Sequence, residues 1–493
     1  MKIEDILAAW ADKRLDAGSV NERLRVDGVP LWFVFERFIT NSLLPAPFPS
    51  FKTIVDGWDA GKFPEPSALK LAFMVRAFAI QERLKWRKRR KITATPMKKV
   101  LFLTYSNHIF YENGASKFYR TDAVIKKMSE SKFKPFVLVV DPLSRRKSSV
   151  AEATLYDFIQ PELRKKARAT ARQLSSAWKI FSESDKTDLL TFEGKSIYPY
   201  IKHHLHFFFS FSFLYIFLTY YFTLKDCVAL NNVRGIYLTA SIGLFEKCAL
   251  MVGRLLDIPI YVAQHGSGVG FGKIHSALME PVTFFVFGDK HKGILIAQGV
   301  PESKINVTGS PMVDELSLLT GKKSKDLRKV LLLTQPFVTD ALWTQAQQQE
   351  FFLRIHEMQR VLDVEFAIKI HPREKRELYE KEFLGVRIAD KNLYEEIAAA
   401  DLVVGVTSTA LMEALLLNRP VVVLDLFNQA MRESHVTAGL SLRTQKVSMD
   451  EVEGYLKFYR SAAFDKKRED YITSYFYKLD GNSAQRIVRL MNS

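Results

Sequence analysis

A strand–turn–helix–strand pattern at residues 402–425 constrains the fold of this chain more than any other feature of its sequence. Its parts are the apolar run 402–404, the hydroxyl-rich turn 405–410, the helix-patterned apolar run 411–417 and the apolar run 420–425. This order predicts a βαβ unit with two parallel strands in one sheet. Ligands of open α/β sheets bind at the carboxyl ends of such strands, and the N–H groups at a helix start attract anions. We therefore predict a phosphate site at Thr407, Ser408 and Thr409.

Glu413 is the single carboxylate in the apolar helix pattern that follows this turn. Ordinary N-capping by Ser408 or Thr409 is an alternative explanation of the hydroxyls. A capping box does not explain Glu413, because neither hydroxyl stands three residues before it. A carboxylate one turn into the helix can accept the hydroxyls of a ribose whose phosphate lies at the helix start. We therefore predict that Glu413 binds ribose.

A second strand-end motif points to the same edge of the sheet. The strand pattern 364–370 ends in His371, Pro372 and Arg373. Proline cannot continue a ladder, so the strand stops there and His371 lies at its carboxyl end. His371 can donate to a phosphate, and Lys369 and Arg373 add positive charge. A solvated strand end is the alternative, but the hydroxyl-rich turn one βα unit downstream favours binding.

The charge of the chain indicates an anionic partner. Its 493 residues suffice for two or three domains, and its formal charge is +17. Nucleic acid, an anionic membrane surface and a phosphorylated substrate all fit such a charge. The densest basic block is 85–91, and no nucleic-acid reader motif surrounds it,. We expect no nucleic-acid partner, and we expect this block to lie at an anionic membrane surface, with a solvated helix end as the alternative.

Cysteine usage and the first residues indicate a cytoplasmic protein. Cys227 and Cys248 are the two cysteines, and their spacing matches neither a disulfide framework nor a metal site,. Residues 1–5 open an acidic amphipathic segment without an apolar core, so no signal peptide is expected,.

The most apolar window, Leu205–Leu224, is long enough to cross a bilayer,. Strand patterns precede it and follow it, and a crossing would separate strands of one sheet. The window is also rich in aromatic residues, which suit a membrane interface. We interpret it as a helix in the cytoplasmic leaflet of a peripheral membrane protein, with a buried core helix as the alternative.

The order of patterns predicts two doubly wound α/β domains that face a cleft, preceded by a helical extension. The predicted segments are the extension 1–95, an N-terminal Rossmann-like domain 96–320, a C-terminal one 327–480 and a last helix 481–493. In the N-terminal domain, a polar loop with His108 and Glu112 follows the first strand, and Gln264, His265 and Gly266 follow a later one.

Several short motifs, taken in order, resemble the GT-B glycosyltransferases. The segment 258–425 resembles that of capsule-polysaccharide transferases, bacterial sialyl- and Kdo-transferases, CDP-glycerol glycerophosphotransferases and non-hydrolysing UDP-GlcNAc 2-epimerases. The matching motifs are Gln264-His265-Gly266, Val307-Thr308-Gly309-Ser310-Pro311-Met312-Val313-Asp314, His371-Pro372, Ser408-Thr409 and Leu479-Asp480-Gly481-Asn482-Ser483-Ala484-Gln485-Arg486-Ile487. In the members that use CMP-sugars, the His-Pro and Ser-Ser/Thr motifs hold the nucleotide.

The resemblance implies a transferase that moves a sugar from a nucleotide donor, a cytidine nucleotide, to a polysaccharide or lipid-linked glycan. It implies donor binding by the C-terminal domain, with Gly309 and Ser310 added to the residues above, and loop contacts from Gln264 and Gly266. It implies no cofactor and no metal, because helix dipoles and cations stabilise the leaving phosphate.

The resemblance places the catalytic base in the N-terminal domain, with Glu112, His108 and His265 as candidates in that order. The sialyltransferase base lies in an acidic-acidic-Gly motif, whereas this chain has Glu112-Asn113-Gly114. The alternative functions are a CDP-glycerol-type glycerophosphotransferase, a UDP-sugar 2-epimerase and a non-catalytic assembly scaffold. The epimerase ranks lower because Thr407-Ser408-Thr409 replaces its acidic and glycine pattern.

Overall fold

The chain divides into two compact units in the computed structural model. The first comprises Met1–His265, Gly270–Phe284 and Met491–Ser493, and the second comprises Gly266–Val269 and Phe285–Leu490. The structure describes residues 13, 18–35, 80, 96–105, 108–112, 115–118, 120–140, 153–192, 194–196, 198–241, 243–266, 274, 276–319, 321, 323–324, 326–339, 342–428 and 434–493. The basic block 85–91 and most of the predicted extension 1–95 lie outside these residues.

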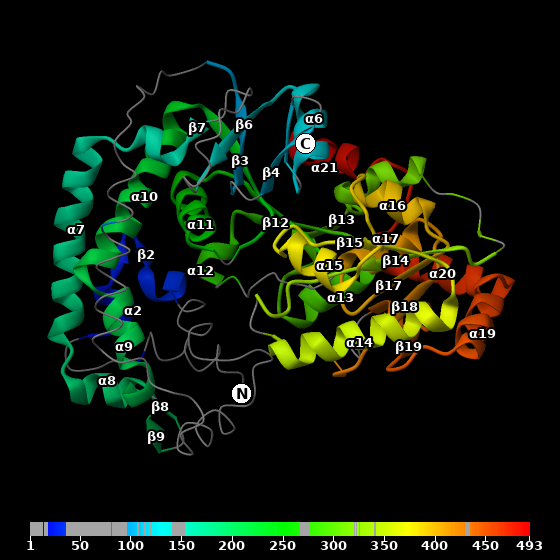
Figure 1. Cartoon of the computed structure of the whole chain (residues 1–493). Helices are drawn as coiled ribbons and strands as arrows, with labels where there is room; N and C mark the ends of the chain where they lie inside the picture. Colours follow the sequence, from blue (N-terminus) through cyan, green and yellow to red (C-terminus); the bar gives the residue numbers. More distant parts are fainter. Residues whose placement is uncertain are drawn as a thin grey trace. The chain divides into compact units, whose positions relative to one another are not determined.

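A seven-stranded sheet forms the core of the first Rossmann-like fold (Figure 1), in the order β13-β12-β11-β10-β3-β6-β7. Its strands are β3 (Lys99–Thr104), β6 (Lys134–Val139), β7 (Ala153–Thr154), β10 (Val233–Leu238), β11 (Ile260–Ala263), β12 (Val282–Val286) and β13 (Ile305–Val307). The pairings β6–β7, β3–β6, β3–β10 and β10–β11 are parallel. The order reverses between β3 and β10, which makes their carboxyl ends the switch point of this sheet.

A six-stranded sheet forms the second Rossmann-like fold, in the order β16-β15-β14-β17-β18-β19. Its strands are β14 (Lys329–Leu333), β15 (Glu365–Lys369), β16 (Arg387–Ile388), β17 (Leu402–Gly405), β18 (Val421–Leu424) and β19 (Leu442–Thr444). All five pairings are parallel. The strands predicted at 364–370, 402–404 and 420–425 are confirmed, and the switch point lies between β14 and β17.

Helices connect these strands in the doubly wound manner that the sequence predicted. In the first unit they are α6 (Asp122–Ser129), α7 (Pro161–Ile180), α8 (Glu183–Leu189), α9 (Tyr198–Phe208), α10 (Phe211–Leu230), α11 (Leu244–Leu256) and α12 (Ser276–Met279). In the second they are α13 (Asp289–Ala297), α14 (Gln345–Leu362), α15 (Arg376–Glu382), α16 (Leu393–Ala399), α17 (Thr409–Leu416), α18 (Ser434–Thr437), α19 (Met449–Tyr459), α20 (Ala462–Phe476) and α21 (Ser483–Asn492).

Shorter elements complete the described chain. They are the helix α2 (Val20–Arg23), the 3-10 helices η2 (Leu155–Phe158), η3 (Glu302–Lys304) and η4 (Pro311–Leu318), and the hairpins β1 (Arg25–Val26) with β2 (Val29–Pro30), β4 (Ile109–Glu112) with β5 (Ala115–Phe118), and β8 (Thr191–Phe192) with β9 (Lys195–Ser196).

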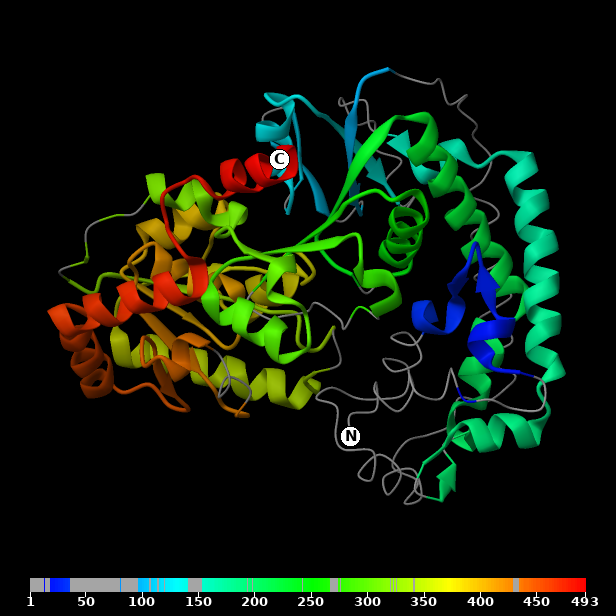
Figure 2. The same cartoon turned by 180° about the vertical axis from the view of Figure 1, so that it is seen from behind.

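The apolar window Leu205–Leu224 is two helices rather than the single one expected. The α9 helix ends at Phe208, and Ser210 caps α10, accepting a hydrogen bond from the Phe213 N–H at 3.2 Å. Among the described residues, α10 is the one helix long and apolar enough to cross a bilayer, yet 78% of its apolar window is buried within the protein. Figures 1 and 2 both show α10 beside α7, which it contacts along its length.

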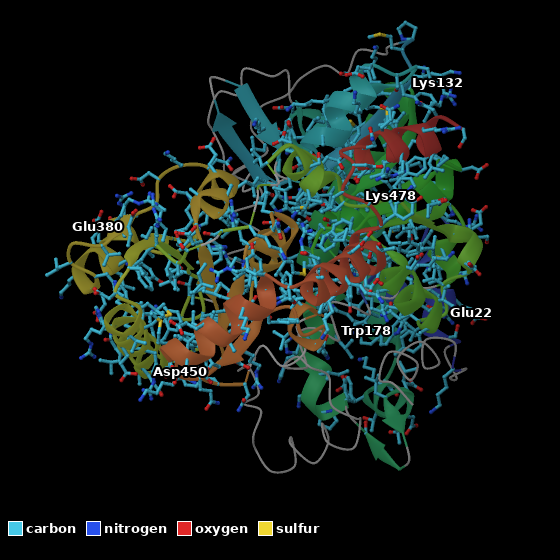
Figure 3. The ribbon with its side chains drawn as sticks, turned by 90° about the vertical axis from the view of Figure 1, so that its right-hand side faces the viewer. Glu22, Lys132, Trp178, Glu380, Asp450 and Lys478 are labelled. Atoms are coloured by element: carbon cyan, nitrogen blue, oxygen red, sulfur yellow. The ribbon has the colours of Figure 1, made fainter. Side chains whose placement is uncertain are left out.

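Aromatic packing explains why this helix is buried. Phe217 is fully buried and meets Phe35 edge-to-face, with ring centroids 5.0 Å apart. Trp178 of α7, labelled in Figure 3, belongs to the same aromatic cluster. Its ring stacks on that of Phe209, with ring centroids 4.6 Å apart. An α10 buried in this way cannot also lie in a lipid leaflet. The structure therefore corrects the interfacial interpretation in favour of the alternative, a core helix.

This packing gives a direct test of the role of α10. We expect Phe217→Ala to lower the free energy of unfolding by about 3–5 kcal/mol, because truncating a buried phenylalanine leaves a cavity. Leu230→Ala is the control, because Leu230 on the same helix is 41% exposed. Urea unfolding followed by circular dichroism measures both. Equal and small losses would show that α10 is not a core helix.

Candidate functional site

The switch point of the second sheet brings together the polar residues that follow β14 and β17. The Thr407 N–H donates to Gln335 Oε1 at 2.9 Å, and the Thr407 hydroxyl donates to the same oxygen at 3.3 Å. Leu332 of β14 lies in register with Val404 of β17, so the two strands end at the same level. The predicted hydroxyl-rich turn is therefore tied to the neighbouring strand end.

Ser408 caps the helix that starts at this turn. Its backbone is extended, and its hydroxyl accepts from the Ala410 N–H at 3.2 Å, so α17 begins at Thr409. The capping interpretation is thus confirmed for Ser408. Capping does not remove the positive end of the helix dipole, which lies directly beside the end of β17. A phosphate at this place would meet that end of α17.

A closed hydrogen-bond network holds the turn after β15. The His371 N–H donates to the Thr334 hydroxyl at 2.9 Å, and that hydroxyl donates to the Glu374 carboxylate. The Tyr379 hydroxyl donates to the other oxygen of Glu374 at 2.6 Å. The Glu374 N–H returns to the His371 carbonyl at 2.9 Å. Because both ends of the turn are tied to one half-buried network, His371 is held beside the end of β14.

The geometry of His371 fixes where its ring proton lies. The Arg373 N–H donates to His371 Nδ1 at 3.2 Å, so Nδ1 acts as an acceptor. In the neutral imidazole the proton then lies on Nε2, which can donate to an anion. The predicted role of His371 as a donor to phosphate is compatible with this tautomer.

The residues around His371 differ in where they point. Lys369 donates its ammonium to the backbone carbonyls of Ala389, at 3.1 Å, and Lys391. The Lys369 ammonium therefore binds backbone carbonyls just after the edge strand β16. Burial lowers the pKa of Lys369. Pro372 and Arg373 are exposed at the turn. Of the predicted cations, Arg373 is the one presented to solvent beside His371.

Glu413 is fully buried on α17. The Tyr394 hydroxyl of α16 donates to its Oε1 at 3.3 Å, and burial raises the pKa of Glu413 to about 7. A carboxyl group with this pKa is partly protonated at neutral pH and can both donate and accept. The structure places Glu413 one turn into the helix, as predicted, but beneath its surface.

Gly309 and Ser310 lie at a structural junction within the second unit. Gly309 has a positive φ of 80°, and a Cβ there would lie 2.5 Å from the Ser483 hydroxyl. Arg486 donates from Nε to the Thr308 carbonyl at 2.7 Å, and the Asp314 carboxylate accepts from the Ser483 N–H at 3.0 Å. The two motifs at 307–314 and 479–483 therefore hold each other, while donor binding by Gly309 and Ser310 stays a prediction.

The first unit holds the predicted catalytic candidates at strand ends. His108 follows β3, and its ring lies 5.7 Å from the ring of Tyr105. His265 follows β11, where burial and the charge of Arg120 lower its pKa to about 4, partly opposed by a hydrogen bond to the Thr239 backbone. Glu112 ends β4 in the β4–β5 hairpin.

The two loop residues predicted beside His265 lie on the same segment. Gln264 is buried directly after β11, and Gly266 has a positive φ of 154°. Within the described ranges, no group of three or more His, Cys, Asp or Glu residues is placed to hold a metal ion.

Sequence reasoning missed the residues that support the donor-side motifs. Gln335, Thr334 and Glu374 give no periodic signal, because each is one polar residue next to a turn. The signal that could have found them is position: Thr334 and Gln335 directly follow an apolar strand, as His371 and Thr407 do. Glu374 follows the His-Pro motif, and burial raises its pKa.

Part of the chain matches the model of a known family. Residues 302–424, about a quarter of the chain, match the family model described as alpha-2,8-polysialyltransferase. A search of curated proteins finds no match.

Solved structures with a similar course of the chain have low sequence identity. The UDP-GlcNAc 2-epimerase from Neisseria meningitidis bound to UDP-GlcNAc is 12% identical over 80% of this chain and 100% of that chain, with a TM-score of 0.48. MnaA of S. aureus with UDP is 13% identical over 80% and 95%, with a TM-score of 0.46. The wall teichoic acid polymerase TagF is 9% identical over 86% and 96%, with a TM-score of 0.44.

Two parallel sheets with Rossmann strand order, of seven and six strands, are the fold of the GT-B class. Together with the family match, they make the chain a nucleotide-sugar glycosyltransferase with the GT-B fold. Its segment 302–424 is similar to the alpha-2,8-polysialyltransferases and contains both His371 and Ser408. The fold class and the glycosyltransferase activity that the resemblance implied are confirmed.

The buried carboxyl of Glu413 predicts a pH effect on stability. Its pKa is raised in the folded state, so the folded chain binds more protons than the unfolded one between about pH 4.5 and 7,. The contribution of Glu413 to the free energy of unfolding should therefore fall as pH rises through this window, by up to about 3 kcal/mol. Glu413→Gln should remove that slope, whereas Glu453→Gln, at an exposed position on α19, should keep it. Urea unfolding at pH 5, 6, 7 and 8 tests this, and an unchanged slope in Glu413→Gln would contradict it.

Proposed function

We propose that this chain transfers a sugar from a cytidine nucleotide donor, such as a CMP-sugar, to a polysaccharide or lipid-linked glycan. The observation that carries the proposal is that the family match and the two strand-end motifs fall in the same part of the fold. The segment similar to alpha-2,8-polysialyltransferases contains the two strand-end motifs, and the structure brings both to the switch point of the second sheet. A nucleotide phosphate is the ligand that the chemistry of this place favours.

Each donor-side residue has a defined task in the proposal. The N-terminus of α17 and Nε2–H of His371 receive the phosphate oxygens, and Arg373 adds positive charge. Glu413 binds the ribose hydroxyls after a small movement of α17, because its carboxyl group is buried in the described conformation. These groups stabilise the negative charge that develops on the leaving phosphate, so the proposal uses no bound metal.

The transfer itself moves one proton and two electron pairs. The acceptor hydroxyl loses its proton to a base and forms a bond to the anomeric carbon. The bond from that carbon to the phosphate oxygen breaks, and the nucleotide leaves with the electron pair. Glu112, His108 and His265 of the first unit remain predicted candidates for the base.

A donor panel tests the function. We expect release of CMP from CMP-sugars that depends on a glycan acceptor, and sugar incorporation into that acceptor. Release of CMP from CDP-glycerol instead would make the chain a glycerophosphotransferase. Interconversion of a UDP-sugar without acceptor would make it an epimerase. Weak nucleotide binding without any turnover would indicate a non-catalytic assembly scaffold.

Substitutions in the donor site should weaken nucleotide binding without unfolding the chain. His371→Ala, and Ser408→Ala together with Thr409→Ala, each remove hydrogen bonds to a charged phosphate, worth about 1.5–3 kcal/mol. This loss corresponds to an affinity drop of about 10- to 150-fold. His356→Ala on α14 is the matched histidine control. Calorimetric titration with CMP, CDP, UDP and GDP measures the change, and wild-type affinity in both donor-site variants would contradict the assignment.

We also propose that the protein is cytoplasmic and associates with the inner face of the membrane through the basic block 85–91. Each basic residue near anionic lipid contributes about 1 kcal/mol, so Arg87→Glu, Arg89→Glu and Arg90→Glu together should reduce flotation with anionic vesicles. The control reverses three exposed lysines of the second unit, Lys381, Lys457 and Lys466, which gives the same change in net charge. Equal flotation of the two triple variants would show that the block is not the attachment site.

A further inference from the structure

A tyrosine–glutamate pair occupies the switch point of the first sheet. The Tyr105 hydroxyl donates to Glu246 Oε2 at 2.7 Å. Tyr105 directly follows β3, and Glu246 lies in the first turn of α11, the helix after β10. Since the strand order reverses between β3 and β10, this pair stands where ligands of such sheets bind.

The chain is shaped around this pair. Glu246 is 5% exposed, while Tyr105 is half-buried. A Cβ on Gly243, the N-cap of α11, would lie 2.1 Å from Glu246 Oε2 and 2.8 Å from the Tyr105 hydroxyl. A side chain at this position would displace the pair, so a glycine is required for it to form.

The carboxyl group of Glu246 is buried and hydrogen-bonded. Burial raises its pKa, and the hydrogen bond from Tyr105 and the charges of Arg120 and Lys247 oppose that shift. The acidic side chain also hydrogen-bonds its own backbone at the start of α11, so this helix start already holds an anion. An acceptor alcohol suits this place better than a second phosphate does.

We propose that Tyr105 and Glu246 form the proton-accepting dyad of the glycosyl transfer, an inference that rests on the proposed function. The acceptor hydroxyl gives its proton to the Tyr105 oxygen, and the proton of Tyr105 passes to Glu246 Oε2. The acceptor oxygen forms its bond to the anomeric carbon, and the nucleotide phosphate leaves with the electrons of the bond that breaks. Tyr105, being half-buried, meets the substrate, and Glu246 receives the proton in the interior.

The test uses the full chain with the donor and acceptor that the wild type turns over. Tyr105→Phe, Glu246→Gln and the double variant are compared for kcat, donor KM and nucleotide affinity. Gly243→Ala keeps both side chains but forces them to move apart from their present positions. Tyr198→Phe is the matched control, because the Tyr198 hydroxyl donates to both oxygens of Glu183 at 2.9 Å on α8, away from the switch point. Thermal unfolding confirms that each variant is folded.

The dyad predicts a loss of kcat of about 100-fold or more in each single variant, because proton transfer to a placed base contributes that much. Nucleotide affinity should stay at the wild-type value, and the double variant should lose no more than the worse single one, since the two groups act as one unit. Gly243→Ala should share the loss of kcat, and Tyr198→Phe should not.

Three results would overturn the proposal. A folded Tyr105→Phe variant with the wild-type kcat would show that the dyad is not the base. This conclusion holds even if Glu246→Gln fails to fold. A loss in Tyr198→Phe equal to that in Tyr105→Phe assigns the effect to stability rather than to chemistry. A wild type that transfers no sugar from any nucleotide donor overturns the proposed function and the dyad together, whereas active wild type with active dyad variants overturns the dyad alone.

Discussion

The reversal of strand order between β14 and β17 is the constraint on which the candidate site depends. Right-handed crossovers run outward from these two strands in opposite directions, so α14 and α17 lie on opposite faces of the sheet. Gln335, Thr407 and Ser408, which follow the two strands, are half-buried there. The hydrogen bond from Thr407 to Gln335 joins the two strand ends. Everything proposed for the donor follows from this geometry.

The same arrangement recurs in the first sheet, with β3 and β10 as the strands that flank the reversal. The two places differ in charge. In the second unit His371 and Arg373 follow β15, the strand next to β14, whereas in the first a helix start already holds the carboxylate of Glu246. An anionic donor suits the former, and a neutral alcohol suits the latter. This division of tasks between two similar folds is what a transferase with two substrates needs.

Burial tunes the carboxyl groups near the donor side in one direction. Burial is the largest influence on the pKa of both Glu374 and Glu413, and it raises both. Glu413, with a pKa of about 7, therefore carries less negative charge at neutral pH than an exposed glutamate does. Repulsion of a phosphate falls accordingly, while both groups still bind hydroxyls: Glu374 accepts from Thr334 and Tyr379, and Glu413 accepts from Tyr394. The positive charge of the chain adds to the attraction.

Sequence patterns predicted the parallel strands well, because a buried strand such as 402–404 is apolar throughout and is bounded by turn residues,. They failed for Leu205–Leu224, since an apolar helix covered by aromatic neighbours has the composition of a membrane helix, and only packing separates the two. Pairings between residues that are distant in the sequence, such as Tyr105 with Glu246 or His371 with Thr334, could not be predicted from sequence patterns either. They depend on strand order, which no local pattern states.

The central claim is that a cytidine nucleotide binds at the switch point of the second sheet. Backbone hydrogen exchange of the full chain, with and without CMP, tests it most directly. The account predicts slower exchange in three short segments that follow parallel strands, 334–337, 371–374 and 407–411, with little change along α10. Protection confined to other parts of the chain, with these three segments unchanged in saturating CMP, would contradict it.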